Sequence, residues 1–257
     1  MPSVEDDLVY ALDPVLWAKE ILGFNPDPWQ NKALQSTARQ SIWNIHRQAG
    51  KSSVAAIKAL SKAVFAPGSL TLVISPSERQ SGELYRKFLG HYDRLESPPG
   101  MIEDKALSCV LETGSRVVAL PGIEDTVRCF SAVSLIIEDE ASRVADALHA
   151  AIRPMLAVSQ GELLLMSTPH GKRGHFFEAW QNGGPSWERI KVTADQCPRI
   201  TPEFLQEERR SLGDWLYRQE YFGEFVETID QLFHYDEVMK AISSDVKPLN
   251  LGVKKPW

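Results

Sequence analysis

The 257-residue sequence has little cysteine and no long hydrophobic run. Its three cysteines, Cys109, Cys129 and Cys197, are odd in number and far apart, which argues against a disulfide framework or a thiolate zinc site. No apolar stretch approaches the ~20 residues needed to span a bilayer. The N-terminus also lacks the basic flank and apolar core of a signal peptide. We therefore expect a reduced intracellular protein that makes no membrane contact.

The chain also lacks an excess of positive charge. It has 28 Lys and Arg against 34 Asp and Glu, a formal net charge of −6. This charge argues against a protein whose whole surface is basic and binds nucleic acid. It does not exclude binding through a local groove or loop in which Lys and Arg contact phosphates. With 43% hydrophobic residues, the composition is that of a globular protein whose single large domain, with at most a small appendage, can bury a core.

Short β-branched runs alternate with helical stretches along the chain, which is typical of an α/β fold with a mostly parallel sheet. The expected strands are 41–45, 70–75, 133–138 and 162–167, with a hairpin of 108–112 and 116–120. The expected helices are 53–66, 78–95, 144–158, 174–181, 202–212 and 214–223.

The strongest local motif is Arg47–Ser52, which reads RQAGKS between an expected strand and an expected helix. This is the setting that a phosphate-binding loop requires. Backbone amides of such a loop cradle phosphate oxygens. Lys51 would bridge the β- and γ-phosphates, and the Ser52 hydroxyl would bind Mg²⁺. The first glycine of the usual pattern is missing, because Ile45 stands there.

A second motif, the apolar strand ending Glu138-Asp139-Glu140, follows 88 residues after Lys51, counted to Asp139. Asp139 would hold Mg²⁺ through its water shell. Glu140 would take a proton from the attacking water as general base. Glu138 stands where an apolar residue is usual, so a register shifted by one residue is an alternative. Acids that only keep a strand end soluble are another.

A third motif, Ser167-Thr168-Pro169, follows the next buried strand. Ligands of open α/β sheets bind at the carboxyl ends of the strands, where these hydroxyls lie. An ordinary turn is the alternative. We expect His170 and His175 to be too isolated from other ligands to form a metal site.

Together these motifs resemble the ATPase domain of the large terminase subunit, the DNA-packaging motor of tailed bacteriophages, over nearly the whole chain. The resemblance implies a RecA-like P-loop ATPase fold with an additional catalytic glutamate, acting with ATP and Mg²⁺. It also implies a core in residues 1–200 and a small helical lid or linker subdomain in residues 201–257.

The resemblance extends to individual residues. It implies adenine binding by Trp29 and Gln30, and coupling of hydrolysis to movement by Ser167 and Thr168. Arg218–Phe225 matches the family's sequence near the end of the ATPase domain. Arg128 is expected to be an arginine finger that acts on a neighbouring subunit, with Arg47 as the competing candidate. The residues expected to contact the phosphates are Gln48, Ala49, Gly50, Lys51, Ser52 and Ser53.

The family's partners are double-stranded DNA, the portal protein and the small terminase subunit, in the host cell cytoplasm. The resemblance also implies a homo-oligomeric ring, usually of five, on the procapsid, with a monomer as the alternative for the isolated domain. The family's nuclease domain is expected to be absent, because the 27 residues after Asp230 are too few to form its sheet. We therefore expect an ATPase domain isolated from a longer protein, without nuclease activity.

Two other functions are kept as alternatives. One is a nucleotide-gated assembly module that docks on the portal or the small terminase without turning over ATP. The other is a helicase-type ATPase, which would need a second RecA-like domain that does not fit in 257 residues.

Overall fold

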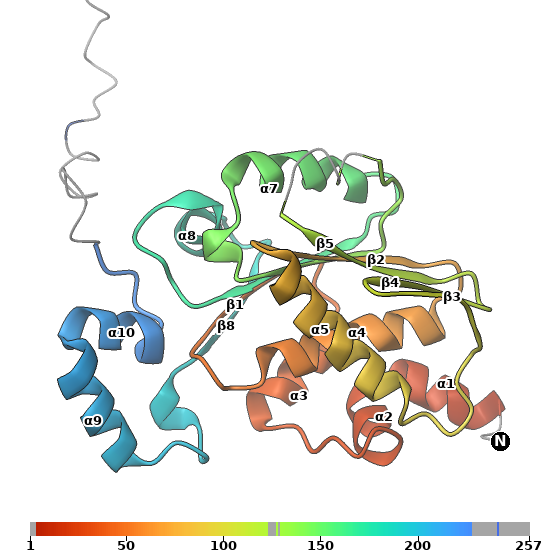
Figure 1. The fold of residues 1–257 in the computed structure, drawn as a ribbon, viewed down its shortest axis with the longest axis horizontal. Coiled ribbons are helices and arrows are strands. Elements are labelled where there is room, and N and C mark those ends of the chain that lie inside the picture. The colour runs from red at the N-terminus through yellow and green to blue at the C-terminus, as the bar shows by residue number, and fades with distance from the viewer. Residues whose placement is uncertain (1–3, 123–126, 128, 228–240, 242–257) are drawn as a thin grey trace, which may run out of the picture. The chain divides into compact units, whose positions relative to one another are not determined.

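The computed structural model describes residues 4–122, 127, 129–227 and 241 (Figure 1). Residues Met1–Val226 form one compact unit, and Glu227–Trp257 form a second, in which only Glu227 and Ala241 are described. Arg128 and the acidic residues of the C-terminal tail, Asp236, Glu237 and Asp245, lie outside the described residues.

The described strands form a mixed sheet of eight, in the order β3-β4-β5-β2-β6-β7-β1-β8. The six strands from β5 to β8 in this order are parallel, and β3 and β4 are added antiparallel at one edge. The strands are β1 (Gln40–Ile45), β2 (Leu70–Ser75), β3 (Met101–Lys105), β4 (Ser108–Leu111), β5 (Arg116–Pro121), β6 (Leu135–Asp139), β7 (Glu162–Ser167) and β8 (Glu188–Val192).

Helices cover both faces of the sheet, with α3, α4 and α5 on one face and α7 and α8 on the other (Figure 1). Two apolar clusters fill the spaces between these layers, so the central parallel strands are buried on both sides. The helices are α1 (Val4–Leu12), α2 (Pro14–Glu20), α3 (Pro28–Gln35), α4 (Lys51–Phe65), α5 (Glu78–Tyr92), α7 (Asp146–Ile152), α8 (Gly174–Gln181), α9 (Pro202–Leu212) and α10 (Asp214–Phe222).

The predicted α/β fold with a mostly parallel sheet is confirmed, and most predicted elements lie within a few residues of their expected bounds. The strand expected at 133–138 is β6, shifted to Leu135–Asp139. The helix expected at 144–158 ends at Ile152 and continues as a 3₁₀ turn over Arg153–Leu156. Pro154, in the first turn of that 3₁₀ segment, has no N–H for an α-helical bond.

Among the described α-helices and β-strands, five were not predicted: α1, α2, α3, β3 and β8. The strand β3 has exposed polar residues and lies at the sheet edge, so its sequence carries no alternating apolar signal. In the part of the chain that the structure describes, no helix is long and apolar enough to cross a membrane.

Candidate functional site

The three sequence motifs meet at the carboxyl edge of the sheet. In the sheet, β7 lies between β6 and β1, which carry the two other motifs. Asn44 of β1 pairs with Ser167 of β7, and Asp139 of β6 pairs with Met166 of β7. The phosphate-loop motif, the acidic motif and the hydroxyl motif therefore leave three adjacent parallel strands at the same level, as ligand-binding loops do in open α/β sheets.

The loop between β1 and α4 depends on left-handed backbone conformations. Gly50 has φ +92°, and a Cβ at this position would lie 2.9 Å from Nε2 of Gln30. Gln48 also has a positive φ of 67°, which is uncommon for a residue with a side chain. Gly50 then leads directly into the first turn of α4, whose free N–H groups suit an anion. Ser52 and Ser53 lie in this first turn, half-buried.

Lys51 is the first residue of α4 and is only 7% exposed. Its Nζ donates to the backbone oxygens of Ile45, at 2.9 Å, and His46, at 3.3 Å. Burial lowers the pKa of Lys51, while the nearby carboxylates of Glu140 and Asp139 oppose this shift. The ammonium group therefore lies inside the loop, on the side of the acidic motif, where a phosphate could replace the two carbonyls as its partner.

Gln30 connects α3 to the same loop. Its side chain is buried, with Oε1 accepting from the backbone N of Asp27 at 2.8 Å and Nε2 donating to the oxygen of Ala49 at 3.1 Å. Trp29 packs edge-on against Trp43, with ring centroids 6.0 Å apart. In this structure Gln30 thus supports the phosphate loop, and its expected contact with adenine stays a prediction that requires it to exchange one of these bonds.

Asp139 and Glu140 end β6 beside the loop. The Oδ1 atom of Asp139 accepts a hydrogen bond from the backbone N of Glu140 at 3.0 Å. Burial and then the charge of Glu140 raise the pKa of Asp139 to about 6, against the opposing effect of Lys51. A bound divalent cation would favour the ionised carboxylate, so this environment fits a metal ligand.

The backbone of Glu140 has a left-handed φ of 52°, a strained conformation of the kind that clusters at functional sites. The side chain is half-buried and accepts a long hydrogen bond, 3.5 Å, from Oγ of Ser167 to Oε2. Ser167 Oγ also lies 2.7 Å from Oγ of Ser142. The predicted base and the first coupling residue are therefore in direct contact.

Glu138 points away from this site. It is completely buried on the α7–α8 side, where its two carboxylate oxygens contact His149 and His175. Successive strand residues face opposite sides of a sheet, so Asp139 faces the loop. The expectation that His175 is isolated is wrong, because the intervening chain brings α7 and α8 together over β6 and stacks the rings of His149 and His175.

Glu220 of α10 is a shared partner that the motifs did not single out by itself. Its Oε2 lies 2.7 Å from Nε of Arg47 and accepts from Oγ1 of Thr168 at 3.4 Å. Its Oε1 lies 3.8 Å from Nη2 of Arg143. The segment after residue 201 therefore contacts the predicted phosphate loop and Thr168, the second of the predicted coupling residues. Only its place in the matched segment Arg218–Phe225 could have indicated this from sequence.

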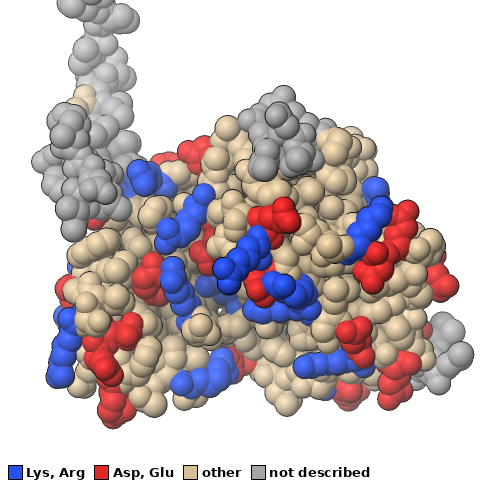
Figure 2. All heavy atoms as spheres, in the orientation of Figure 1, with Lys and Arg blue, Asp and Glu red and all other residues tan. Residues whose placement is uncertain are grey.

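Basic side chains surround the carboxyl edge of the sheet. Figure 2 shows Lys and Arg gathered near the start of α5 and between α5 and α10, with acids among them. Among these cations, Arg47 acts on the buried Lys51 and Lys87 acts on the buried Asp139. Arg143 and Arg173 act on the half-buried His170, which directly follows the hydroxyl motif. Despite the net charge of −6, the site is thus locally supplied with cations suited to phosphate.

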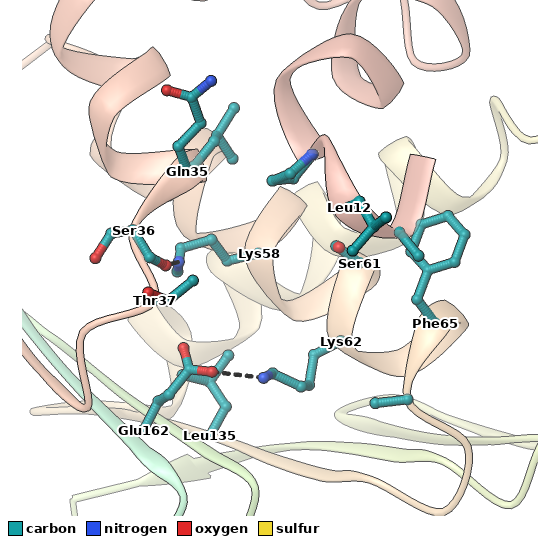
Figure 3. Close-up of a pocket in the computed structure, with 14 residues that line it drawn as sticks. Leu12, Gln35, Ser36, Thr37, Lys58, Ser61, Lys62, Phe65, Leu135 and Glu162 are labelled. Atoms are coloured by element: carbon teal, nitrogen blue, oxygen red, sulfur yellow. Dashed lines mark hydrogen bonds and ion pairs between the residues drawn. The ribbon is translucent and has the colours of Figure 1, made fainter. Parts of the chain in front are cut away.

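A separate cavity of about 350 Å³ lies at the opposite end of the strands, beside Leu135 and Glu162 (Figure 3). Its two lysines already have partners within the protein. Lys62 Nζ is 2.5 Å from Oε1 of Glu162, and Lys58 donates to the backbone oxygens at the end of α3. We assign this cavity no role in the site.

No family model matches the chain. Among curated proteins, the large terminase subunits of Thermus phage G20c and Thermus virus P23-45 are each 26% identical over 83% of this chain and 51% of their own length. The chain thus spans about half the length of these relatives. Among solved structures, the large terminase ATPase domain of Thermus phage P74-26 is 24% identical, with a TM-score of 0.75, over 84% of this chain and 100% of that one.

The large terminase of bacteriophage D6E, solved in complex with ADP, is 12% identical with a TM-score of 0.59, over 86% of this chain and 53% of its own. The predicted resemblance to the large terminase ATPase domain is confirmed by these relatives, and so is the predicted RecA-like fold. None of these comparisons tests the individual site residues, which stay predictions.

Proposed function

We propose that this chain is the ATP-hydrolysing motor domain of a viral large terminase, which drives double-stranded DNA into a procapsid. The main support is that Lys51, in the loop that contains Gly50, lies close to Asp139 and Glu140. Ser167 in turn contacts Glu140. The ADP complex of the related D6E protein supports the choice of an adenine nucleotide.

In the proposed reaction, separate residues bind the phosphates, activate the water and hold the metal ion. The loop amides and the start of α4 bind the phosphates, and Lys51 exchanges its carbonyl partners for the β- and γ-phosphate oxygens. Glu140 orients the attacking water and accepts its proton on a carboxylate oxygen. Asp139 and Ser52 would hold Mg²⁺, whose charge offsets the negative charge that builds up on the phosphates.

Movement is proposed to pass from Glu140 through the coupling residues to α10. Ser167 contacts the base, and the adjacent Thr168 contacts Glu220. A change at the γ-phosphate therefore has a two-residue path to α10. We propose residues 1–200 as the core and residues 201–257 as a lid or linker subdomain that responds to this change.

The proposed partners are double-stranded DNA, the portal protein and the small terminase subunit, with subunits arranged in a ring. In such a ring, Arg128 is proposed to act in trans, with Arg47 as the cis candidate. Mixing Arg128→Ala subunits with Glu140→Gln subunits tests this, because only a trans arginine restores hydrolysis at interfaces that pair an intact pocket with an intact finger.

Steady-state phosphate release is the direct test of the function. We expect turnover by the wild type, none by Lys51→Ala, and wild-type turnover by the control Glu224→Gln, which alters a surface ion pair with Arg218. A wild-type chain that binds ATP but releases no phosphate, with or without DNA, would instead indicate a nucleotide-gated assembly module. No DNA cleavage is expected with Mg²⁺ or Mn²⁺.

A further inference from the structure

A buried hydrogen-bonded network connects β6, the strand that ends at Asp139, to α7 and α8. Glu138 is completely buried and accepts from Nδ1 of His149 at 2.7 Å and from Nε2 of His175 at 2.9 Å. Nδ1 of His175 lies 3.0 Å from Oδ1 of Asp146. The two imidazole rings are stacked, with centroids 4.1 Å apart and planes 10° from parallel.

The network keeps a charged carboxylate in the middle of the sheet. Burial acts to raise the pKa of Glu138, but the hydrogen bonds from the two histidines outweigh it and leave the pKa lowered. Burial likewise acts to lower the pKa of His175, yet its bonds to Glu138 and Asp146 leave it raised. A well-packed apolar residue is often at least as stable as a buried ion pair, so overall stability gives little reason for this arrangement.

The network joins two parts of the proposed reaction path. Glu138 directly precedes Asp139 and Glu140. His175 is the second residue of α8, the helix that follows the coupling residues. Asp146 also accepts from the backbone N of His175 at 2.7 Å, and the positive φ of Gly174 lets the chain approach it closely.

A metal ion is the other reading of two histidines and a glutamate whose ligand atoms lie within 4.8 Å of one another. The N–O distances of 2.7 and 2.9 Å are those of hydrogen bonds. A metal bound by imidazole lies in the plane of the ring, and two stacked, nearly parallel rings share no such point. The geometry therefore favours the network as it stands.

We propose that Glu138, held by His149 and His175, is a positioning residue that fixes Asp139 and Glu140 and connects them to the coupling segment through α8. This rests on the proposed ATP hydrolysis. It adds a second route between the coupling residues and the base, on the face of the sheet opposite the nucleotide.

Amide isosteres test the role of each hydrogen bond. Asn places an amide nitrogen near the position of Nδ1, and Gln places one near Nε2. We therefore expect His149→Asn and His175→Gln to keep kcat, whereas His149→Ala and His175→Ala lower it by roughly 10- to 100-fold, as small misplacements of catalytic groups do. The KM for ATP should change little, because the phosphate loop is untouched.

The matched control is Leu148→Ala, which removes buried side-chain volume from α7 next to His149 but breaks no hydrogen bond to Glu138. A double-mutant cycle adds Glu138→Gln to wild type and to Glu140→Gln. If Glu138 acts through the base, Glu138→Gln lowers the rate of single-turnover hydrolysis in the wild type. In the Glu140→Gln background, the same substitution changes that rate little.

Hydrogen exchange of the amides of residues 138–142 gives a readout that does not need turnover. Exchange should rise in the two alanine variants and stay near wild type in the isosteres and in Leu148→Ala. Wild-type protection and kcat in the alanine variants would overturn the proposal, as would equal effects in Leu148→Ala. Stoichiometric Zn²⁺ binding that His149→Ala abolishes would make the network a metal centre instead. Failure of the wild type to hydrolyse ATP would refute the proposed function alone, because hydrogen exchange still decides the positioning role.

Discussion

Arg47 and Glu220 are 173 positions apart in the sequence and form an ion pair with an Nε–Oε2 distance of 2.7 Å. Arg47 belongs to the phosphate loop, and Glu220 belongs to α10. The side chain of Arg47 is 58% exposed, so its pairing is easily exchanged, whereas Glu220 is largely buried. In the proposed function, an incoming γ-phosphate would compete with Glu220 for this arginine, so the ion pair would respond to the bound nucleotide.

Glu220→Ala should strengthen the binding of ATP analogues relative to ADP, because it frees Arg47 for the γ-phosphate. Ion pairs with one exposed partner contribute about 0.2–1 kcal/mol, so we expect the ratio of the two Kd values to change by roughly 1.4- to 5-fold. Titration with ATP-γ-S and ADP measures it. Glu224→Ala, which removes the ion pair that Arg218 of α10 makes just beyond the end of the helix, is the control. An unchanged ratio would leave Glu220 without influence on Arg47.

Lys51→Ala should abolish ATP turnover and weaken nucleotide binding, because it removes the ammonium group that faces the β- and γ-phosphates. Loss of the two hydrogen bonds to the loop carbonyls adds to the effect. Phosphate release and nucleotide titration measure the two losses separately. Retained hydrolysis would remove the phosphate-loop assignment.

Glu140→Gln should keep nucleotide binding while hydrolysis falls by roughly 10²- to 10⁴-fold, since it removes the general base. The amide retains the shape of the side chain and can still accept from Ser167. Single-turnover hydrolysis with bound ATP measures the loss. Glu138→Gln should have the smaller effect, and a reversed order would mean that the two roles are exchanged.

Gln30→Ala should reduce the preference for ATP over GTP more than it slows ATP hydrolysis, if the amide reads adenine. The structure adds a second expectation, because Nε2 of Gln30 supports Ala49 in the phosphate loop. Affinity for ADP and GDP should then fall together with the change in preference. Competition binding with the four nucleotides separates the two effects, and an unchanged ATP preference would leave Gln30 with the supporting role alone.

Stability should depend on His91 below neutral pH. The ring of His91 is buried against Phe24, and its Nδ1 has no hydrogen-bond partner among the described residues. Burial lowers the pKa of His91 to about 4, and Arg94 and Lys87 act in the same direction. The unfolded chain therefore takes up a proton near pH 6.5, well before the folded chain does.

This difference in pKa makes stability fall as the pH drops from about 7 towards 4. At pH 5 the loss from His91 is about 2 kcal/mol. In His91→Gln this contribution is absent, so its free energy of unfolding should fall less between pH 7.5 and pH 5. Urea unfolding of both proteins at the two pH values measures the two losses of stability. The other histidines contribute equally to both losses, so they cancel when the two proteins are compared. Parallel losses in both proteins would contradict the assignment.

The sequence determined the parts of this protein that depend on local pattern. Apolar runs bounded by turn residues located β2 and β7, and Pro67-Gly68 marked the end of α4 near its observed last residue, Phe65. Gly50 and Lys51 located the candidate phosphate loop, because its conformation needs a glycine within the motif itself. The polar edge strand β3 and the short α2 carry no comparable periodic signal.

Only the tertiary structure decided which distant residues meet. Placing β7 between β6 and β1 brought Ser167 to Glu140, and packing α10 on this edge brought Glu220 to Arg47 and Thr168. The same holds for Glu138, whose carboxylate interrupts the apolar pattern of its strand. Only the packing of α7 and α8 over the strand shows that two histidines bind this carboxylate. Periodicity records which face of an element is buried, whereas the partner that satisfies a buried charge depends on how separate elements pack.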